Sequence, residues 1–129
     1  MYQLSSREEQ LSREIVDCAY KVHKQLGPGL LEKIYEACFC RELEKKNIPF
    51  KRQVEIPVYY DGVQLKEVLR LDVLVDELII IETKAAETLL PLWYAQLRSY
   101  LKLFNKKVGF LLNFNVILMK QGIRRFCVD

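Results

Sequence analysis

Hydrophobic positions in the first third of the chain recur at helical spacing. Between Ser5 and Leu26 the apolar residues stand three or four positions apart, which predicts an amphipathic helix. Ser5 or Ser6 can cap its start, and the Gly27-Pro28-Gly29 turn ends it, because glycine favours the C-cap and proline cannot continue a helix. A second helix is predicted over residues 30–46. Its expected buried face consists of Leu31, Ile34, Tyr35, Cys38, Phe39 and Leu43.

From residue 50 onward the apolar period changes to two, the period of β-strands. The predicted strands cover residues 50–60, 63–75, 78–84, 108–114 and 123–128. Asp61-Gly62 is a strong hairpin signal between the first two strands. A third helix is predicted over residues 89–104, and residues 116–120 show no clear pattern. The element order ααβββαββ predicts an α/β sandwich, a mixed sheet flanked by helices, in one domain over residues 1–129.

Charged residues interrupt the apolar runs of residues 70–84. Side chains alternate between the two faces of a strand, so Asp72 shares a face with Leu74, and Glu82 and Lys84 share one with Ile80. An ionised carboxylate is costly to bury unless it is paired or bound to a metal. Two carboxylates and an ammonium on core-facing strands therefore indicate a functional site.

Whether Asp72 and Glu82 meet depends on the turn between their strands. A two-residue turn would place them on opposite faces of the sheet, whereas a three-residue loop over residues 76–78 sets them directly across from each other. The same register sets Arg70 across from Lys84. The turn lacks the Asn-Gly or Asp-Gly pair of two-residue hairpins, so we expect the longer loop or an equivalent bulge. The alternative is a surface hairpin with a solvated charged face.

Asp72, nine intervening residues, Glu82 and Lys84 resemble the core motif of the PD-(D/E)XK nuclease superfamily. Gly29, Glu32 and Tyr35 match the motif that names the GxxExxY protein family, a branch of that superfamily. The similarity runs from about residue 15 to residue 125. It also includes Val22-His23, the turn over residues 26–29, Gln96 with Tyr100, and Leu112-Asn113-Phe114.

The resemblance implies a PD-(D/E)XK-like fold and a metal-dependent nuclease. Asp72 and Glu82 would hold Mg²⁺ or Mn²⁺, since carboxylate oxygens suit these cations. The main-chain carbonyl of Thr83 and the carboxylate of Glu32 would be further ligands. Lys84 would orient or help to deprotonate the attacking water and offset charge on the phosphate.

Three further residues have a structural interpretation beside the functional one. Glu32 falls in the first turn of a helix, where the helix dipole stabilises a carboxylate without any metal. Gln96 and Tyr100 lie four apart and share a helix face. In exonuclease-like branches of the superfamily such a pair lines the active site; the alternative is an exposed Gln96 and a core Tyr100. His23 is interpreted as structural and not as a ligand.

The net charge of +3 permits nucleic-acid binding without requiring it. Lys51, Arg52, Arg98 and Arg124 would track phosphates if they lie near the carboxylates, which gives affinity without sequence readout. We expect a nucleic-acid partner, DNA in preference to RNA. A homodimer or a protein partner is an open alternative.

No apolar run approaches the roughly 18–20 residues of a membrane span. The polar N-terminus lacks a signal-peptide core, so we expect a cytoplasmic protein with no membrane partner. The four cysteines have no zinc-binding spacing and are expected to be buried, reduced thiols. The competing function classes are an inactive nucleic-acid- or protein-binding module of the same fold and a structural subunit, because a fold does not establish a function.

Overall fold

Two helices open the chain, as the hydrophobic spacing predicts. In the computed structural model, which describes residues 3–128, α1 covers Ser6–Leu26 and α2 covers Glu32–Lys45. Ser5 caps α1: its hydroxyl accepts the amide hydrogen of Glu8, and the Glu8 carboxylate accepts that of Ser5. The predicted domain spans residues 1–129, of which Met1, Tyr2 and Asp129 lie outside the described residues.

The predicted buried face of α2 is wrong at two positions. Leu31 is 75% exposed and Ile34 is 46% exposed. The buried stripe is Tyr35, Phe39 and Leu43, residues four apart on one side of the helix. Ile34 stands one residue off this stripe, which turns its side chain by about 100°. Leu31 precedes the first helical residue and belongs to the turn.

Five strands and a third helix follow. The strands are β1 (Phe50–Tyr60), β2 (Val63–Val75), β3 (Ile79–Lys84), β4 (Val108–Asn113) and β5 (Ile123–Cys127). They form one sheet in the order β1-β2-β3-β4-β5, in which only the β3–β4 pair is parallel. Helix α3 (Pro91–Leu103) makes the crossover between that pair, and a 3₁₀ helix (Met119–Gly122) occupies the segment without a clear sequence pattern. The predicted mixed α/β fold is confirmed.

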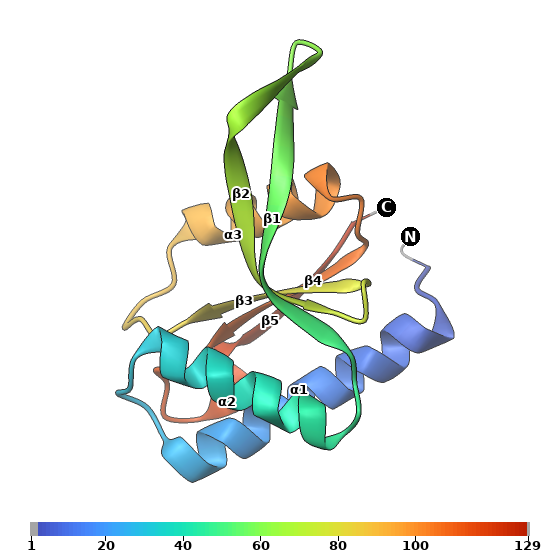
Figure 1. Cartoon of the computed structure of the whole chain (residues 1–129). Coiled ribbons are helices and arrows are strands. Elements are labelled where there is room, and N and C mark those ends of the chain that lie inside the picture. The colour runs from blue at the N-terminus through green and yellow to red at the C-terminus, as the bar shows by residue number, and fades with distance from the viewer. Residues whose placement is uncertain (1–2, 129) are drawn as a thin grey trace.

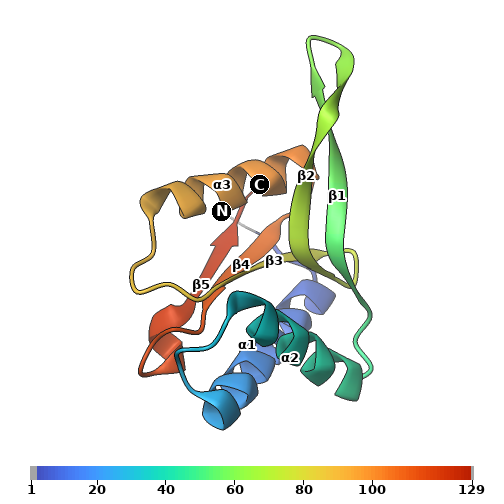
Figure 2. The same ribbon diagram turned by 60° about the vertical axis from the view of Figure 1, so that its left-hand side comes forward.

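The helices lie on opposite faces of the sheet (Figures 1 and 2). Helices α1 and α2 cover one face, whose strand residues include Val73, Val75 and Ile81. Helix α3 covers the other, where Leu97 and Leu101 pack with Leu74, Ile80 and Leu111. Among residues 3–128, no helix is both long and apolar enough to cross a membrane.

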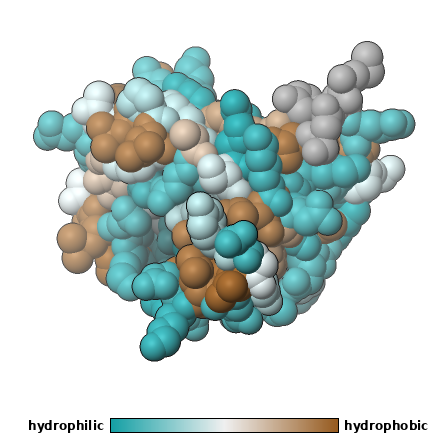
Figure 3. All heavy atoms as spheres, turned by 90° about the horizontal axis from the view of Figure 1, so that it is seen from above, coloured by the Kyte–Doolittle hydropathy of each residue, from teal (hydrophilic) through white to brown (hydrophobic). Residues whose placement is uncertain are grey.

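The β1–β2 pair projects from the body of the protein as a two-stranded arm (Figures 1 and 2). Strand β2 pairs with β3 only at Val73, Leu74 and Val75, so the rest of its length pairs with β1 alone. Near the tip Tyr60 is 75% exposed. Figure 3 looks down on the arm and shows apolar and polar side chains mixed on that side of the molecule.

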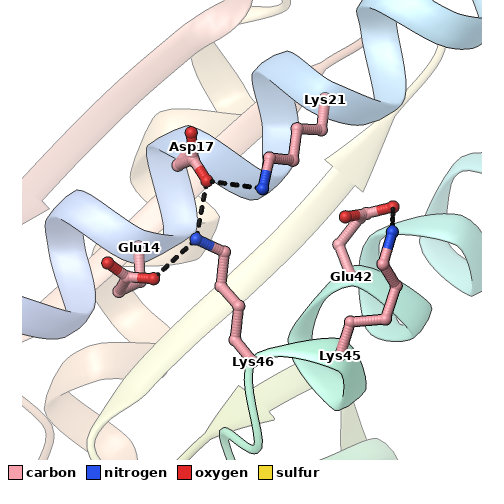
Figure 4. A network of polar contacts seen from close by, with 6 residues as sticks. All are labelled: Glu14, Asp17, Lys21, Glu42, Lys45 and Lys46. Carbon is pink, nitrogen blue, oxygen red and sulfur yellow. Dashed lines mark hydrogen bonds and ion pairs between the residues drawn. The ribbon is translucent and has the colours of Figure 1, made fainter.

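Ion pairs join α1 to the end of α2 (Figure 4). The ammonium of Lys46 bonds to Glu14 at 2.7 Å and to Asp17 at 2.6 Å, and Lys21 approaches Asp17 at 3.3 Å. These side chains are partly exposed, so each pair contributes about 0–1 kcal/mol. The network joins the two helices and is not a candidate catalytic site.

Tyr35 closes the glycine turn between α1 and α2. Its hydroxyl donates to the carbonyl oxygen of Gly27 at 2.6 Å and accepts the amide hydrogen of Leu30 at 3.0 Å. Its ring stacks on Phe114, with centroids 4.7 Å apart. Gly29 has φ +100°, which glycine adopts without strain. Gly29 and Tyr35 therefore fix the start of α2, and with it Glu32, against the end of β4.

Replacing Tyr35 with phenylalanine removes both hydrogen bonds and keeps the stacked ring. We expect Tyr35→Phe to lower the free energy of unfolding by about 1–2 kcal/mol in urea denaturation, since each lost bond is worth about 0.5–1.5 kcal/mol. Tyr20→Phe is the matched control, because Tyr20 is 43% exposed and lies outside this turn. Equal effects of the two substitutions would contradict the assigned role of the hydroxyl.

Candidate active site

Asp72 and Glu82 meet where β2 separates from β3. The ladder runs from Val75 opposite Ile79 to Val73 opposite Ile81, the register of the predicted three-residue loop. Past Val73 the ladder ends. There the amide of Asp72 donates to Oε2 of Glu82 at 2.9 Å, and the amide of Thr83 donates to Oδ2 of Asp72 at 2.8 Å. Each carboxylate thus accepts an amide hydrogen from the neighbouring strand, at the point where the two strands part.

The predicted pairing of Arg70 with Lys84 is wrong. Beyond Val73, strand β2 continues paired only to β1, and Arg70 lies opposite Glu55 with an ion pair of 3.6 Å. Residues of two strands stay opposite each other only along an unbroken ladder. Strands β2 and β3 diverge after Val73, before Arg70 is reached.

Each of the two carboxylates keeps one oxygen available. Oδ1 of Asp72 and Oε1 of Glu82 accept no hydrogen bond from residues 3–128. Because no side-chain oxygen in that range is both buried and unpartnered, the two oxygens reach solvent. The pKa of Glu82 is raised to about 8, first by burial and then by the negative charge of Asp72. Burial likewise raises the pKa of Asp72. The pair is a set of hard oxygen donors, and within the described residues neither carboxylate forms an ion pair.

Lys84 lies on the same strand, two residues beyond Glu82. Its ammonium nitrogen sits 4.6 Å from the ring centroid of Trp93, a cation–π distance. Its positive charge opposes the burial that raises the pKa values of Asp72, Glu82 and Glu32. Lys84 makes no ion pair with a carboxylate of the described chain. Trp93 therefore positions this ammonium, a contact that the sequence analysis missed.

A family model for the PD-(D/E)XK nuclease superfamily matches residues 9–126. The chain belongs to this superfamily. No curated protein and no solved structure gives a significant match to it. The match covers nearly the whole chain, including Asp72, Glu82 and Lys84, so the superfamily part of the sequence resemblance is confirmed.

Glu32 approaches this superfamily motif from the first turn of α2. Its side chain is exposed, yet the surrounding protein raises its pKa, first by desolvation and then, among other charges, through Asp72 and Glu36, while Lys84 lowers it. Within residues 3–128, no three acidic, histidine or cysteine side chains converge closely enough to hold an ion. Of the three predicted carboxylate ligands, the structure brings together Asp72 and Glu82. The ligand role of Glu32 stays a prediction.

Gln96 and Tyr100 lie on the α3 side of the superfamily motif. The Gln96 amide donates to the Tyr100 hydroxyl at 2.9 Å. Gln96 is exposed and Tyr100 is buried, as the structural alternative expected. The pKa of Tyr100 is nevertheless raised, first by burial and then by the charge of Glu82, so the hydroxyl lies near the carboxylates. The burial pattern is thus that of the structural alternative, and the role of the pair in an active site stays a prediction.

The four basic residues predicted to track phosphates have different surroundings. Lys51 pairs with Glu77 at 2.8 Å, on the surface. Arg98 is exposed on α3. Arg124 donates to the carbonyl oxygens of Gln121 and Ile123, and the register places it two strands from Glu82 on the same face. Arg52 is held by a buried acid on α2.

That acid is Glu36, a residue that the sequence analysis missed. Its side chain is only 4% exposed. Arg52 donates to it through Nε at 3.0 Å, with Nη2 at an ion-pair distance of 2.9 Å, and the side-chain amide of Gln53 donates at 3.1 and 3.2 Å. Glu36 lies one turn after Glu32, on the same helix face, which is the one sequence signal that points to it.

The segment after Lys84 is fixed by the end of β4. Asn113 accepts the amide hydrogens of Ala86 and Asn115 and donates to the carbonyl oxygen of Ala86 at 2.9 Å. The amide of Phe114 donates to the carbonyl oxygen of Lys84 at 3.0 Å. Nε2 of His23 lies 2.7 Å from the carbonyl oxygen of Val116, a structural contact.

The cysteines lie apart from this site. All four are free thiols, but only Cys18 and Cys40 are buried, and burial raises the pKa of each to about 12. Cys38 and Cys127 are half-buried. The expectation of four buried thiols is therefore right for two of them.

The raised pKa of Glu82 predicts a pH dependence of stability in metal-free protein. Between its unfolded pKa of 4.5 and its folded pKa of about 8, the folded state binds the additional proton. Stability should therefore fall as pH rises through this window, by up to about 1.4 kcal/mol per pH unit. Glu82→Gln should lose this share of the slope and be the more stable protein above pH 8.

Denaturation of both proteins at a series of pH values, with a chelator present, measures the difference. Glu44→Gln, an exposed carboxylate near the end of α2, serves as the control. Parallel curves for the parent and Glu82→Gln would show that Glu82 has an ordinary pKa.

Proposed function

We propose that this chain is a divalent-metal-dependent nuclease that hydrolyses nucleic-acid phosphodiester bonds, with DNA favoured over RNA. The observation that carries the proposal is the pair of hydrogen bonds at the β2–β3 junction, from the Asp72 amide to Glu82 and from the Thr83 amide to Asp72. It holds two carboxylates together, each with one solvent-facing oxygen, on the strands that bear the motif of a nuclease superfamily. Within that superfamily we assign the chain to the GxxExxY branch, which Gly29, Glu32 and Tyr35 support.

The donor set fits Mg²⁺ or Mn²⁺. Both cations prefer carboxylate oxygens, and Mg²⁺ commonly binds one or two protein carboxylates and completes its shell with water and phosphate. Asp72 and Glu82 would hold the ion, with the Thr83 carbonyl and Glu32 as the further ligands that the resemblance implies. When bound, such a cation polarises a phosphate and activates water.

The other residues of the site have roles that follow from their positions. The Lys84 ammonium, held against Trp93, supplies positive charge beside the carboxylates and would offset the negative charge that develops on a phosphate. Gln96 orients the Tyr100 hydroxyl, which can donate to a phosphate oxygen or to water. Neither role requires a base-specific contact.

The substrate class follows from the same features. Lys51, Arg98 and Arg124 are exposed cations that can contact phosphates, and Arg52 would do so only after leaving Glu36. We therefore propose weakly sequence-dependent binding. The homodimer or protein partner and the cytoplasmic location stay predictions from the sequence.

A binding module without turnover is the second candidate. The observation that favours it is the absence of a third acidic ligand beside Asp72 and Glu82 in the described part of the chain. Such a module would bind nucleic acid in the same place and leave the phosphodiester intact.

Metal binding is tested by stability, independently of any substrate. Mg²⁺ or Mn²⁺ should raise the free energy of unfolding of the parent protein by about 2.7 kcal/mol at a hundred times the dissociation constant. Asp72→Asn and Glu82→Gln should lose this increase, whereas Lys84→Ala should keep it because it removes no ligand. Thermal melts of these proteins, with Glu44→Gln as control, measure the effect. Equal increases in all five would mean that the ion binds elsewhere.

Cleavage is tested on single-stranded, duplex and branched DNA and RNA. The parent protein should cut at least one of them with Mg²⁺ or Mn²⁺ and none with a chelator. Lys84→Ala should bind substrate and metal but cut at least about a hundredfold more slowly, the scale of a lost acid–base or charge-stabilising group. A parent protein that binds nucleic acid and metal but cuts nothing would favour the binding module.

Phosphate contacts are tested by salt titration of binding. The logarithm of the association constant should fall linearly with the logarithm of salt concentration. Arg98→Ala or Arg124→Ala should each reduce the slope by about 1, because each removes one phosphate contact. Lys45→Ala, whose side chain pairs with Glu42 on α2, should leave it unchanged. An affinity that ignores salt would exclude phosphate tracking.

A further inference from the structure

Strand β1 bends at Gln53, which has φ +52°. Six non-glycine residues of the described chain have positive φ. Five of them lie in turns, and Gln53 alone lies inside a strand. This backbone conformation is unfavourable for a residue with a Cβ atom, so surrounding contacts must maintain it.

The bend lies directly opposite Asp72. The β1–β2 ladder pairs Arg52 with Val73 and Val54 with Leu71, and it has no pair at the position between them. On the other side of β2, the ladder with β3 ends at Val73. Asp72 is therefore the residue at which both ladders of its strand are interrupted.

The bend also exchanges the two faces of the ribbon. In a regular strand Leu71 and Val73 would share a face. Here Val73 packs in the core beneath α1 and α2, and Leu71 packs in the core beneath α3. Phe50 and Ile56 of β1 divide in the same way. The change of face leaves Asp72 between the two cores, with its amide directed to the Glu82 carboxylate.

Glu36 binds the side chain of Gln53 at this bend. Both of its carboxylate oxygens accept hydrogen from the Gln53 amide, and the guanidinium of Arg52 compensates its charge. The carboxylate is nearly inaccessible to solvent, so its contacts point to a role inside the protein rather than to a ligand at the surface.

We propose that Glu36 is a positioning residue for the candidate active site: through the Gln53 side chain it maintains the bend in β1, and the bend sets the Asp72–Glu82 pair. The link to catalysis rests on the proposed nuclease function, but the link to geometry does not. The hydrogen bonds between Glu36 and the Gln53 side chain form the tether. Loss of this tether should first loosen the hydrogen bonds that the Asp72 and Thr83 amides donate to the two carboxylates.

Amide hydrogen exchange of metal-free protein measures that geometry directly. In Glu36→Ala the amides of Asp72 and Thr83 should exchange about tenfold faster. This scale follows from the unfavourable free energy of a left-handed backbone conformation at a residue that has lost its tether. The amide of Ile81, inside the intact ladder, should be unaffected, and Glu44→Ala on the same helix should change neither group. Unchanged exchange of Asp72 and Thr83 in folded Glu36→Ala would overturn the proposal.

Two substitutions at Gln53 separate the tether from the bend. Gln53→Ala and Gln53→Gly both remove the tether, but a positive φ is unfavourable for alanine and not for glycine. Exchange at Asp72 and Thr83 should therefore accelerate in Gln53→Ala and stay near the parent rate in Gln53→Gly. Adding Gln53→Gly to Glu36→Ala should restore slow exchange. Equal exchange in the alanine and glycine variants would overturn the proposal, and this pair decides the matter if Glu36→Ala does not fold.

The same variants keep this inference separate from the proposed function. In a protein that cleaves nucleic acid, kcat should fall about tenfold in Gln53→Ala and recover in Gln53→Gly, with KM unchanged, because the proposed effect acts through the position of Asp72 and not through substrate binding. A parent protein that cleaves nothing would refute the nuclease proposal and leave the exchange result standing. Altered exchange with an unaltered kcat would overturn the positioning role.

Discussion

The site depends on how two backbone amides are satisfied where β2 leaves β3. Beyond Val73 the amides of Asp72 and Thr83 have no ladder partner on the neighbouring strand, and a buried amide without a partner is costly. The carboxylates of Glu82 and Asp72 accept those hydrogens. This solution brings two carboxylates into one partly buried place, where burial raises the pKa of both. Divergence of the strands and the meeting of two carboxylates are thus one structural event, and the cation that we propose would compensate their charge.

The surrounding elements are each fixed to this junction by specific contacts. Tyr35 closes the turn that precedes α2 and stacks on Phe114, which ties the start of α2 to the end of β4. Asn113 holds the segment that follows Lys84. Because these residues come from separate parts of the chain, the site is defined by the fold as a whole. Gly29 and Tyr35 of the GxxExxY motif support the start of α2 structurally.

The sequence predicts most of this arrangement, and the exceptions have physical causes. Periodicity identifies the elements, and the composition of the turn at residues 76–78 gives the correct register of β2 against β3. Alternation assumes a continuous ladder, so it could not place Arg70, which lies beyond the divergence. Helical spacing locates a buried stripe to within one residue, which misplaced Ile34. The Glu36–Gln53 contact joins residues 17 apart in different elements, and no local pattern encodes a tertiary contact of that kind.

The projecting arm has a mechanical consequence. The strand that carries Asp72 continues without interruption to Val63 at the tip, a distance of about 30 Å at the usual rise per residue. The arm is a two-stranded ribbon whose register shifts between Pro57 and Tyr59, and its base is the bend at Gln53. A force applied to the tip would therefore act on the backbone at Asp72 over this length. If nucleic acid binds the arm, a deflection of the tip would change the angle between β2 and β3 at Asp72, where hydrogen bonds join the two carboxylates to the opposite strands.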